Sequence, residues 1–161
     1  MISSRDPLRV TIAILLVCCP LMSQTLPSNP VKPDLAQRQT RMWQAIREAL
    51  VAPNGAEYFR LNLYSTEVPG GAGGLRRLRG TVLSSQTVLE PRVVLLTMTN
   101  ETAVAEVMLQ FKSAWGRALP SGTEVEFSGI PRSFGLDPFL LTFEVIRFEV
   151  LPKPTPPSRP K

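Results

Sequence analysis

The stretch Phe139-Leu140-Leu141-Thr142-Phe143-Glu144-Val145-Ile146-Arg147-Phe148-Glu149-Val150 predicts a long β-strand. Apolar side chains recur at every second position, which is the period of a strand with one buried face. The first inward set consists of Leu141, Phe143 and Val145. A second apolar set follows on the opposite parity and consists of Ile146, Phe148 and Val150. Because strand side chains alternate with a period of two, this change predicts a bulge, or a strand that starts in a barrel and finishes under a helix.

Four segments upstream of this strand are also predicted to be strands, and the second of them is apolar on both faces. They are Leu78 to Ser85, Arg92 to Thr99, Ala105 to Lys112, and Glu124 to Phe127. Gly80 lies inside the first segment, where a glycine commonly marks a bulge or a bend. Glu124 and Glu126 share one face about 7 Å apart, on the polar side of their strand, so we expect both to face solvent. Residues 75–151 are therefore predicted to form a mainly β domain.

An amphipathic helix is predicted before these strands. Asp34 is a suitable N-cap, and Pro53 ends the helix near Ala52. The apolar residues at helical spacing are Leu35, Met42, Trp43, Ile46 and Leu50, and we interpret them as core. The alternation from Tyr58 to Tyr64 predicts a short strand, and Gly70 to Gly74 predict a flexible connection within the 34–74 region.

The first 23 residues have the pattern of a cleavable signal peptide. Arg5 and Arg9 precede an apolar run of 13 residues, Val10 to Met22, and Ser23 follows it. A bilayer-spanning helix needs about 20 apolar residues, so the run is short for an anchor. We expect export to a periplasmic or secreted location, with cleavage after Ser23. A retained anchor and acylation at Cys18 or Cys19 remain alternatives, and either one would attach the protein to a membrane.

Both flanks of the folded region are rich in proline. Residues 24–33 contain three prolines and predict an extended tether, and residues 152–161 contain five prolines and predict a polyproline-like tail. Residues 75–151 hold eight basic and eight acidic side chains. The high isoelectric point, about 9.8, therefore comes mostly from the tail and does not indicate a basic binding face.

The pattern of the β region resembles OB-fold barrels, small five-stranded barrels with a glycine in the first strand and a long fifth strand. The run that carries the resemblance extends from Gly122 to Val145 and begins Gly122-Thr123-Glu124-Val125-Glu126-Phe127-Ser128-Gly129. It looks most like the tRNA-anticodon-binding-like group and the barrel terminus of uncharacterised exported bacterial proteins. The resemblance implies a five-stranded OB-like barrel over residues 75–151, without a catalytic motif. Residues 112–122 leave little room for the helix that OB-folds often place there, so the N-terminal helix is expected to close the barrel instead.

The residue types disfavour catalysis and metal binding. The sequence contains no histidine, which excludes histidine-based triads and most transition-metal sites. The only two cysteines are Cys18 and Cys19, so a chain cleaved after Ser23 has no thiol. We therefore expect neither an enzyme nor a cofactor.

The distribution of charge disfavours nucleic acid as the partner. The second and third strands carry one aromatic residue, Phe111, which belongs to the inward phase. Acidic side chains on the fourth and fifth strands would repel phosphates. A nucleic-acid or polyanion binder remains the alternative, and Arg76, Arg77 and Arg79 are the basic cluster that favours it.

The sequence is best interpreted as a non-enzymatic binding or scaffold module. Its ligand or protein partner, its oligomeric state and its biological process have no signature in the sequence. We expect recognition at the barrel rim, in a loop from Ile130 to Pro138 that joins the fourth and fifth strands. Arg132 and Phe134 are the candidate partner-binding residues, because they offer a charge and an aromatic ring. A structural role for Phe134, folded back on the barrel end, is an equal alternative.

Overall fold

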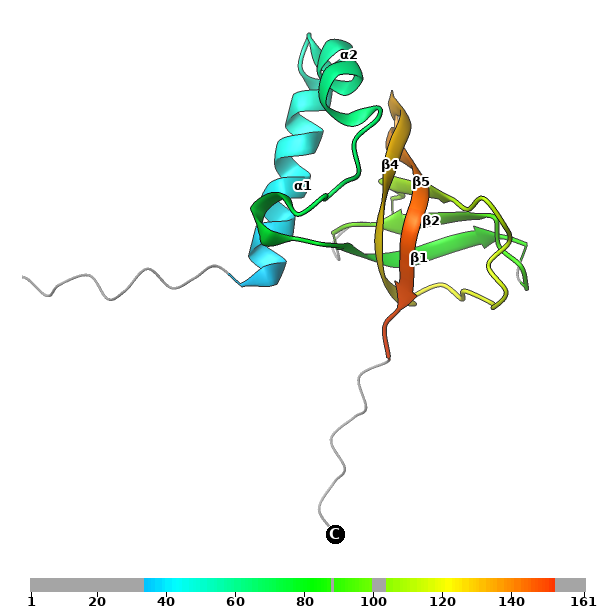
Figure 1. Ribbon diagram of the computed structural model, residues 1–161. Coiled ribbons are helices and arrows are strands. Elements are labelled where there is room, and N and C mark those ends of the chain that lie inside the picture. The colour runs from blue at the N-terminus through cyan, green and yellow to red at the C-terminus, as the bar shows by residue number, and fades with distance from the viewer. Residues whose placement is uncertain (1–33, 88, 100–103, 153–161) are drawn as a thin grey trace, which may run out of the picture. The chain divides into compact units, whose positions relative to one another are not determined.

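The computed structural model describes residues 34–87, 89–99 and 104–152 (Figure 1). The predicted signal peptide, the tether and residues 153–161 of the predicted tail lie outside this part of the chain. Within it, no helix combines the length and the hydropathy needed to cross a membrane.

Five strands close into a barrel, which confirms the predicted mainly β fold with one preceding amphipathic helix. The strands are β1 (Leu78–Gln86), β2 (Val93–Thr97), β3 (Val107–Gln110), β4 (Glu124–Leu136) and β5 (Phe139–Val150). They pair in the order β1-β2-β3-β5-β4, and β4 pairs with β1 to complete the closure. β3 and β5 run parallel, and every other pair is antiparallel. This arrangement is compatible with an OB-like fold.

The barrel interior is filled by alternate residues of all five strands. Side chains with no exposed area include Val82, Val94, Leu96, Val107, Leu109, Val125, Phe127, Leu141 and Phe143. The rings of Phe127 and Phe143 meet edge to face at 5.5 Å, from neighbouring strands β4 and β5. The inward positions predicted from the alternation of β5 are thus confirmed for Leu141 and Phe143.

A bulge in β5 explains the change of parity that the sequence shows. Ser128 of β4 pairs with Arg147, and the next residue, Gly129, pairs with Val145, so Ile146 is the extra residue. The bulge returns Phe148 to the phase of Phe127, its partner on β4. At the same point, a Cβ atom on Gly129 would lie 2.5 Å from the carbonyl oxygen of Glu144, so only glycine fits there.

The helix α1 (Leu35–Val51) packs against one end of the barrel (Figure 1, cyan). Asp34 accepts a hydrogen bond from the Leu35 amide at 2.6 Å, and the helix ends at Ala52, as predicted. Trp43, Ile46 and Leu50 are buried and belong to one hydrophobic cluster with the barrel interior. Trp43 meets Phe139, the first residue of β5, edge to face at 6.1 Å. The beginning of β5 therefore lies under the helix, and the expectation that its end would do so was wrong.

The prediction of a short strand from Tyr58 to Tyr64 was also wrong. The chain turns after α1 into α2 (Gly55–Tyr58) and a π-helical turn, η1 (Phe59–Leu63). Phe59 and Leu63 are buried, whereas Leu61 is 61% exposed. Phe59 and Leu63 are four residues apart and therefore lie on one face of a helix. Together with Leu61 they also fit the period of two of a strand, which is why the sequence predicted one. Gly55 permits this turn, because a Cβ atom there would lie 1.9 Å from the carbonyl oxygen of Leu50.

The connection from η1 back to β1 runs along one edge of β4. Val68 and Gly129 exchange two backbone hydrogen bonds, of 2.8 and 3.1 Å. The glycine-rich stretch then forms a short 3-10 turn, η2 (Ala72–Gly74). Between β3 and β4, residues 111–123 contain no helix, as expected from their length.

Replacing Trp43 with alanine is predicted to lower the free energy of unfolding by about 3–5 kcal/mol, because the substitution leaves a cavity where α1 meets the barrel. Urea unfolding of the full chain measures this change. Leu35→Ala is the matched control, since Leu35 lies on the same helix but is 52% exposed, and a change within about 0.5 kcal/mol is expected.

Deletion of residues 34–52 is predicted to unfold the barrel. Burial of Trp43, Ile46 and Leu50 contributes about 5–9 kcal/mol, at about 1.5–3 kcal/mol per side chain, which is comparable to the whole stability of a small domain. A truncated protein that melts at the temperature of the full chain would contradict this prediction.

Candidate functional site

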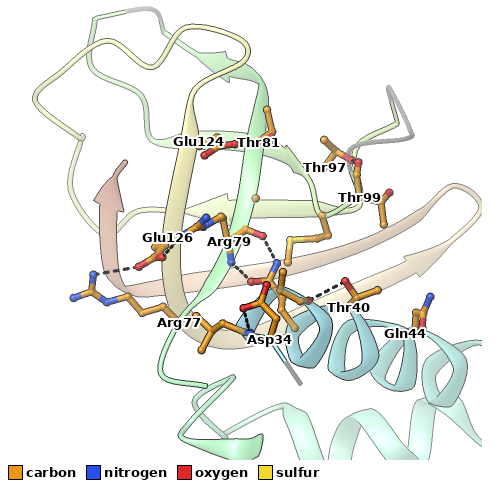
Figure 2. A pocket seen from close by; sticks show the side chains of 15 residues that line it. Asp34, Thr40, Gln44, Arg77, Arg79, Thr81, Thr97, Thr99, Glu124 and Glu126 are labelled. Carbon is orange, nitrogen blue, oxygen red and sulfur yellow. Dashed lines mark hydrogen bonds and ion pairs between the residues drawn. The ribbon is translucent and has the colours of Figure 1, made fainter. Parts of the chain in front are cut away.

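A groove of about 650 Å³ lies between the first half of α1 and the barrel (Figure 2). α1 contributes one wall, and β1, the residues at the end of β2 and the beginning of β4 contribute the other. The polar side chains that line the groove include Gln39, Gln44, Arg79, Thr81, Glu124 and Glu126.

Gln39 fixes the distance between the two walls. Its amide nitrogen donates to the carbonyl oxygen of Arg79 at 2.6 Å, and its amide oxygen accepts from the backbone N–H of Arg79 at 2.7 Å. The pairing of β1 with β2 begins at Thr81, so Arg79 has no strand neighbour on that side. The glutamine side chain therefore satisfies the free edge of β1 in the way that another strand would.

The two arginines of the groove are neutralised. Arg79 donates to the Glu126 carboxylate at 3.0 Å, and Arg77 lies 3.8 Å from the same group. Arg77 also forms an ion pair with Glu149 of β5. Two residues of the predicted basic cluster, Arg77 and Arg79, are therefore held by carboxylates, whereas Arg76 is exposed and does not line the groove.

Three polar groups of the groove remain available. In the described ranges, the Glu124 carboxylate forms no ion pair, and the Thr81 hydroxyl and the Gln44 amide form no side-chain hydrogen bond. Glu124 and Thr81 are register partners on β4 and β1, so their side chains lie on the same face (Figure 2). This corner of the groove can accept hydrogen bonds from a cation or from a ligand rich in donors.

Among the residues that the structure describes, no cluster of three acidic, histidine or cysteine side chains could hold a metal ion. Glu144, whose pKa is lowered from its ordinary value, lies outside the lining.

A buried carboxylate joins α1 to the barrel below the groove. Glu106, just before β3, is 4% exposed and accepts from Arg47 at 3.1 Å and from the Trp43 indole at 3.5 Å. The Met98 amide and the Thr99 hydroxyl donate to its other oxygen at 3.0 and 3.3 Å. Glu106 alternates along the chain with the inward residues Val107 and Leu109, and it is buried because α1 covers its position.

The candidate residues Arg132 and Phe134 do not lie in a loop. The predicted loop from Ile130 to Pro138 is the second half of β4, which reaches Leu136, followed by the two-residue turn Asp137-Pro138. The prediction of a loop came from Gly129, Pro131 and Gly135, because glycine and proline are typical of loops. β4 nevertheless accommodates Pro131, because beyond the bridge between Gly129 and Val68 it pairs only with β5, and a proline is tolerated on a strand with a free side.

Both candidate side chains already have partners within the fold. Arg132 pairs with Glu144 at 2.7 Å, and the ring of Phe134 lies 5.0 Å from that of Phe59. The contact with Phe59 therefore supports the alternative prediction that Phe134 has a structural role. A role of either residue in partner binding stays a prediction.

Comparison of the chain with models of known protein families, with curated proteins and with solved structures gave no match.

Glu144 makes the electrostatics of β5 testable. Hydrogen bonds from Lys112, the larger cause, and from Arg132 lower the pKa of this carboxyl group. Lys112→Met is predicted to raise the Glu144 pKa towards its ordinary value, as measured by a carboxyl-carbon NMR titration. Because the folded-state pKa is lowered, the stabilisation is present above the unfolded pKa and is lost as the pH falls through the folded value. Arg92→Met removes an exposed cation that pairs with no described carboxylate, and an equal effect of this control would contradict the assignment.

Proposed function

We propose that this chain is an exported, non-enzymatic binding module, and that the groove beside α1 holds a cationic or donor-rich part of its ligand or protein partner. The observation that carries the proposal is the unpaired Glu124 carboxylate, with Thr81 opposite it, in a groove whose arginines are already paired. An unpaired acceptor beside neutralised cations favours a positively charged or hydrogen-bond-donating ligand.

The non-enzymatic part of the proposal is supported by the residue types of the groove. The groove presents threonine hydroxyls and carboxylates, and the sequence has no histidine, the side chain that most often activates a hydroxyl as a nucleophile. The closed barrel and its strand order are compatible with an OB-like fold, and the finer resemblance to OB-fold proteins of the tRNA-anticodon-binding-like group stays part of the proposal.

A nucleic-acid or polyanion binder is less well supported at this groove. Its phosphates would meet Glu124 and Glu126, and the nearby arginines would have to exchange existing partners. Rim recognition through Arg132 would likewise require its release from Glu144.

Titration of the isotopically labelled protein with two capped peptides, Ala-Lys-Ala-Ala and Ala-Glu-Ala-Ala, tests the groove. The lysine peptide is expected to shift the amide resonances of Thr81 and Gln44, because its ammonium group can pair with Glu124. Glu124→Gln should weaken this binding about tenfold, as expected for the loss of one charge-assisted hydrogen bond.

The matched control is Glu90→Gln, because Glu90 is an exposed glutamate outside the groove lining. Its affinity for the lysine peptide should equal that of the unchanged protein. A preference for the glutamate peptide, or unchanged binding in the Glu124→Gln variant, would refute the groove proposal.

Export is tested by the mass of the protein recovered from the envelope and the medium of an expressing bacterium. Cleavage after Ser23 predicts a chain that begins at Gln24 in a fraction free of membranes. A full-length mass in the membrane fraction would establish the retained anchor instead. A lipid-modified mass that begins at Cys18 or Cys19 would establish acylation.

A further inference from the structure

A second hollow, of about 480 Å³, lies at the other end of β3 and β5. These two strands run parallel, so their first residues face α1 and their last residues lie at the opposite end of the barrel. The hollow is bordered by the segment Phe111 to Trp115, which follows β3, and by Val145 to Phe148 of β5. Among its residues, only Arg77 also borders the groove beside α1.

Three aromatic rings form the apolar part of this hollow. Phe148 meets Phe111 at 4.9 Å and Trp115 at 4.8 Å, both nearly edge to face, and Phe111 lies 6.0 Å from Trp115. All three are partly exposed and pack against the barrel core. A flat apolar molecule gains both buried area and ring contacts on such a surface.

The charged side chains of this hollow are all cations. The lining contains Arg77, Lys112 and Arg147 and no carboxylate. Arg77 is paired with Glu149, and Lys112 lies 2.8 Å from Glu144. Within the described ranges Arg147 forms no ion pair, so its guanidinium is the cation that a ligand can reach without breaking a contact.

Trp115 contributes a hydrogen-bond donor without an acceptor. Its indole nitrogen is enclosed, and no described group accepts its proton. The backbone of the residue is held by a hydrogen bond of 2.9 Å from its N–H to the Pro91 carbonyl oxygen, so the side chain alone is without a polar anchor. An unsatisfied buried donor costs about 1–3 kcal/mol, and a tilt of the ring towards an acceptor in the hollow would recover this cost.

We propose that this hollow binds a flat apolar group that carries one anionic substituent. The aromatic rings contact the flat group, Arg147 pairs with the anion, and the Trp115 indole N–H turns to donate to an anionic oxygen. The site is independent of the function proposed for the groove beside α1, whose available group is a carboxylate and which suits ligands of the opposite charge.

Phenyl phosphate is the probe that tests this site, with calorimetry for affinity and the two indole N–H resonances for position. Binding is expected to shift the Trp115 resonance and to leave that of the buried Trp43 unchanged. Arg147→Gln should weaken binding about tenfold, and Trp115→Phe, which keeps an aromatic ring but removes the donor, should weaken it about threefold or more.

Arg41→Gln is the control, because Arg41 is an exposed arginine of α1 outside this hollow. It should leave the affinity for phenyl phosphate unchanged. Inorganic phosphate and benzyl alcohol supply the anion and the ring separately, and each should bind at least tenfold more weakly than phenyl phosphate. Equal binding of inorganic phosphate, or an affinity that Arg147→Gln does not change, would overturn the proposal.

Discussion

The fold depends on the contact between α1 and the barrel that is centred on Glu106. A buried carboxylate loses several kcal/mol of solvation, so it persists only where enough donors surround it. Two of its donors, Trp43 and Arg47, lie one turn apart on α1, and the other two come from the chain after β2. Arg47 also lies over the ring of Phe139, 5.3 Å from its centre. Apolar packing alone would let the helix slide, whereas these directional bonds allow one position.

The position of α1 determines the shape of the groove. With the helix fixed at Glu106, Gln39 lies about one turn before Trp43 and reaches the free edge of β1. Directional bonds join the helix to the barrel at these two places, and the groove lies between the first half of α1 and the beginning of β4. The groove is thus a consequence of how the helix is held. Its charge follows from the ion pairs on the barrel surface, which leave Glu124 without a partner among the described residues.

Regular periodicity in the sequence predicted the helix α1 and the existence of all five strands. It failed where one pattern fits two structures or where a distant element covers a residue. Phe59, Leu61 and Leu63 satisfy both a strand and a helix, and only the packing of Phe59 and Leu63 decides between them. Glu106 is polar by sequence but lies under α1, from a segment about 60 residues away, and the exchange between Gln39 and Arg79 spans 40 positions. Long-range contacts of this kind leave no periodic signal, so the groove was not predicted.

The bulge at Ile146 explains why one strand can serve both ends of the barrel. Before it, Leu141 and Phe143 fill the interior and Phe139 lies against Trp43. Without the extra residue, the inward phase would continue through Val145 to Arg147, and a guanidinium would point into the barrel end. The bulge instead places Phe148 inward, against Phe111 and Trp115, and turns Arg147 outward. The parity change in the sequence is therefore the feature that gives the second hollow both its aromatic surface and its unpaired cation.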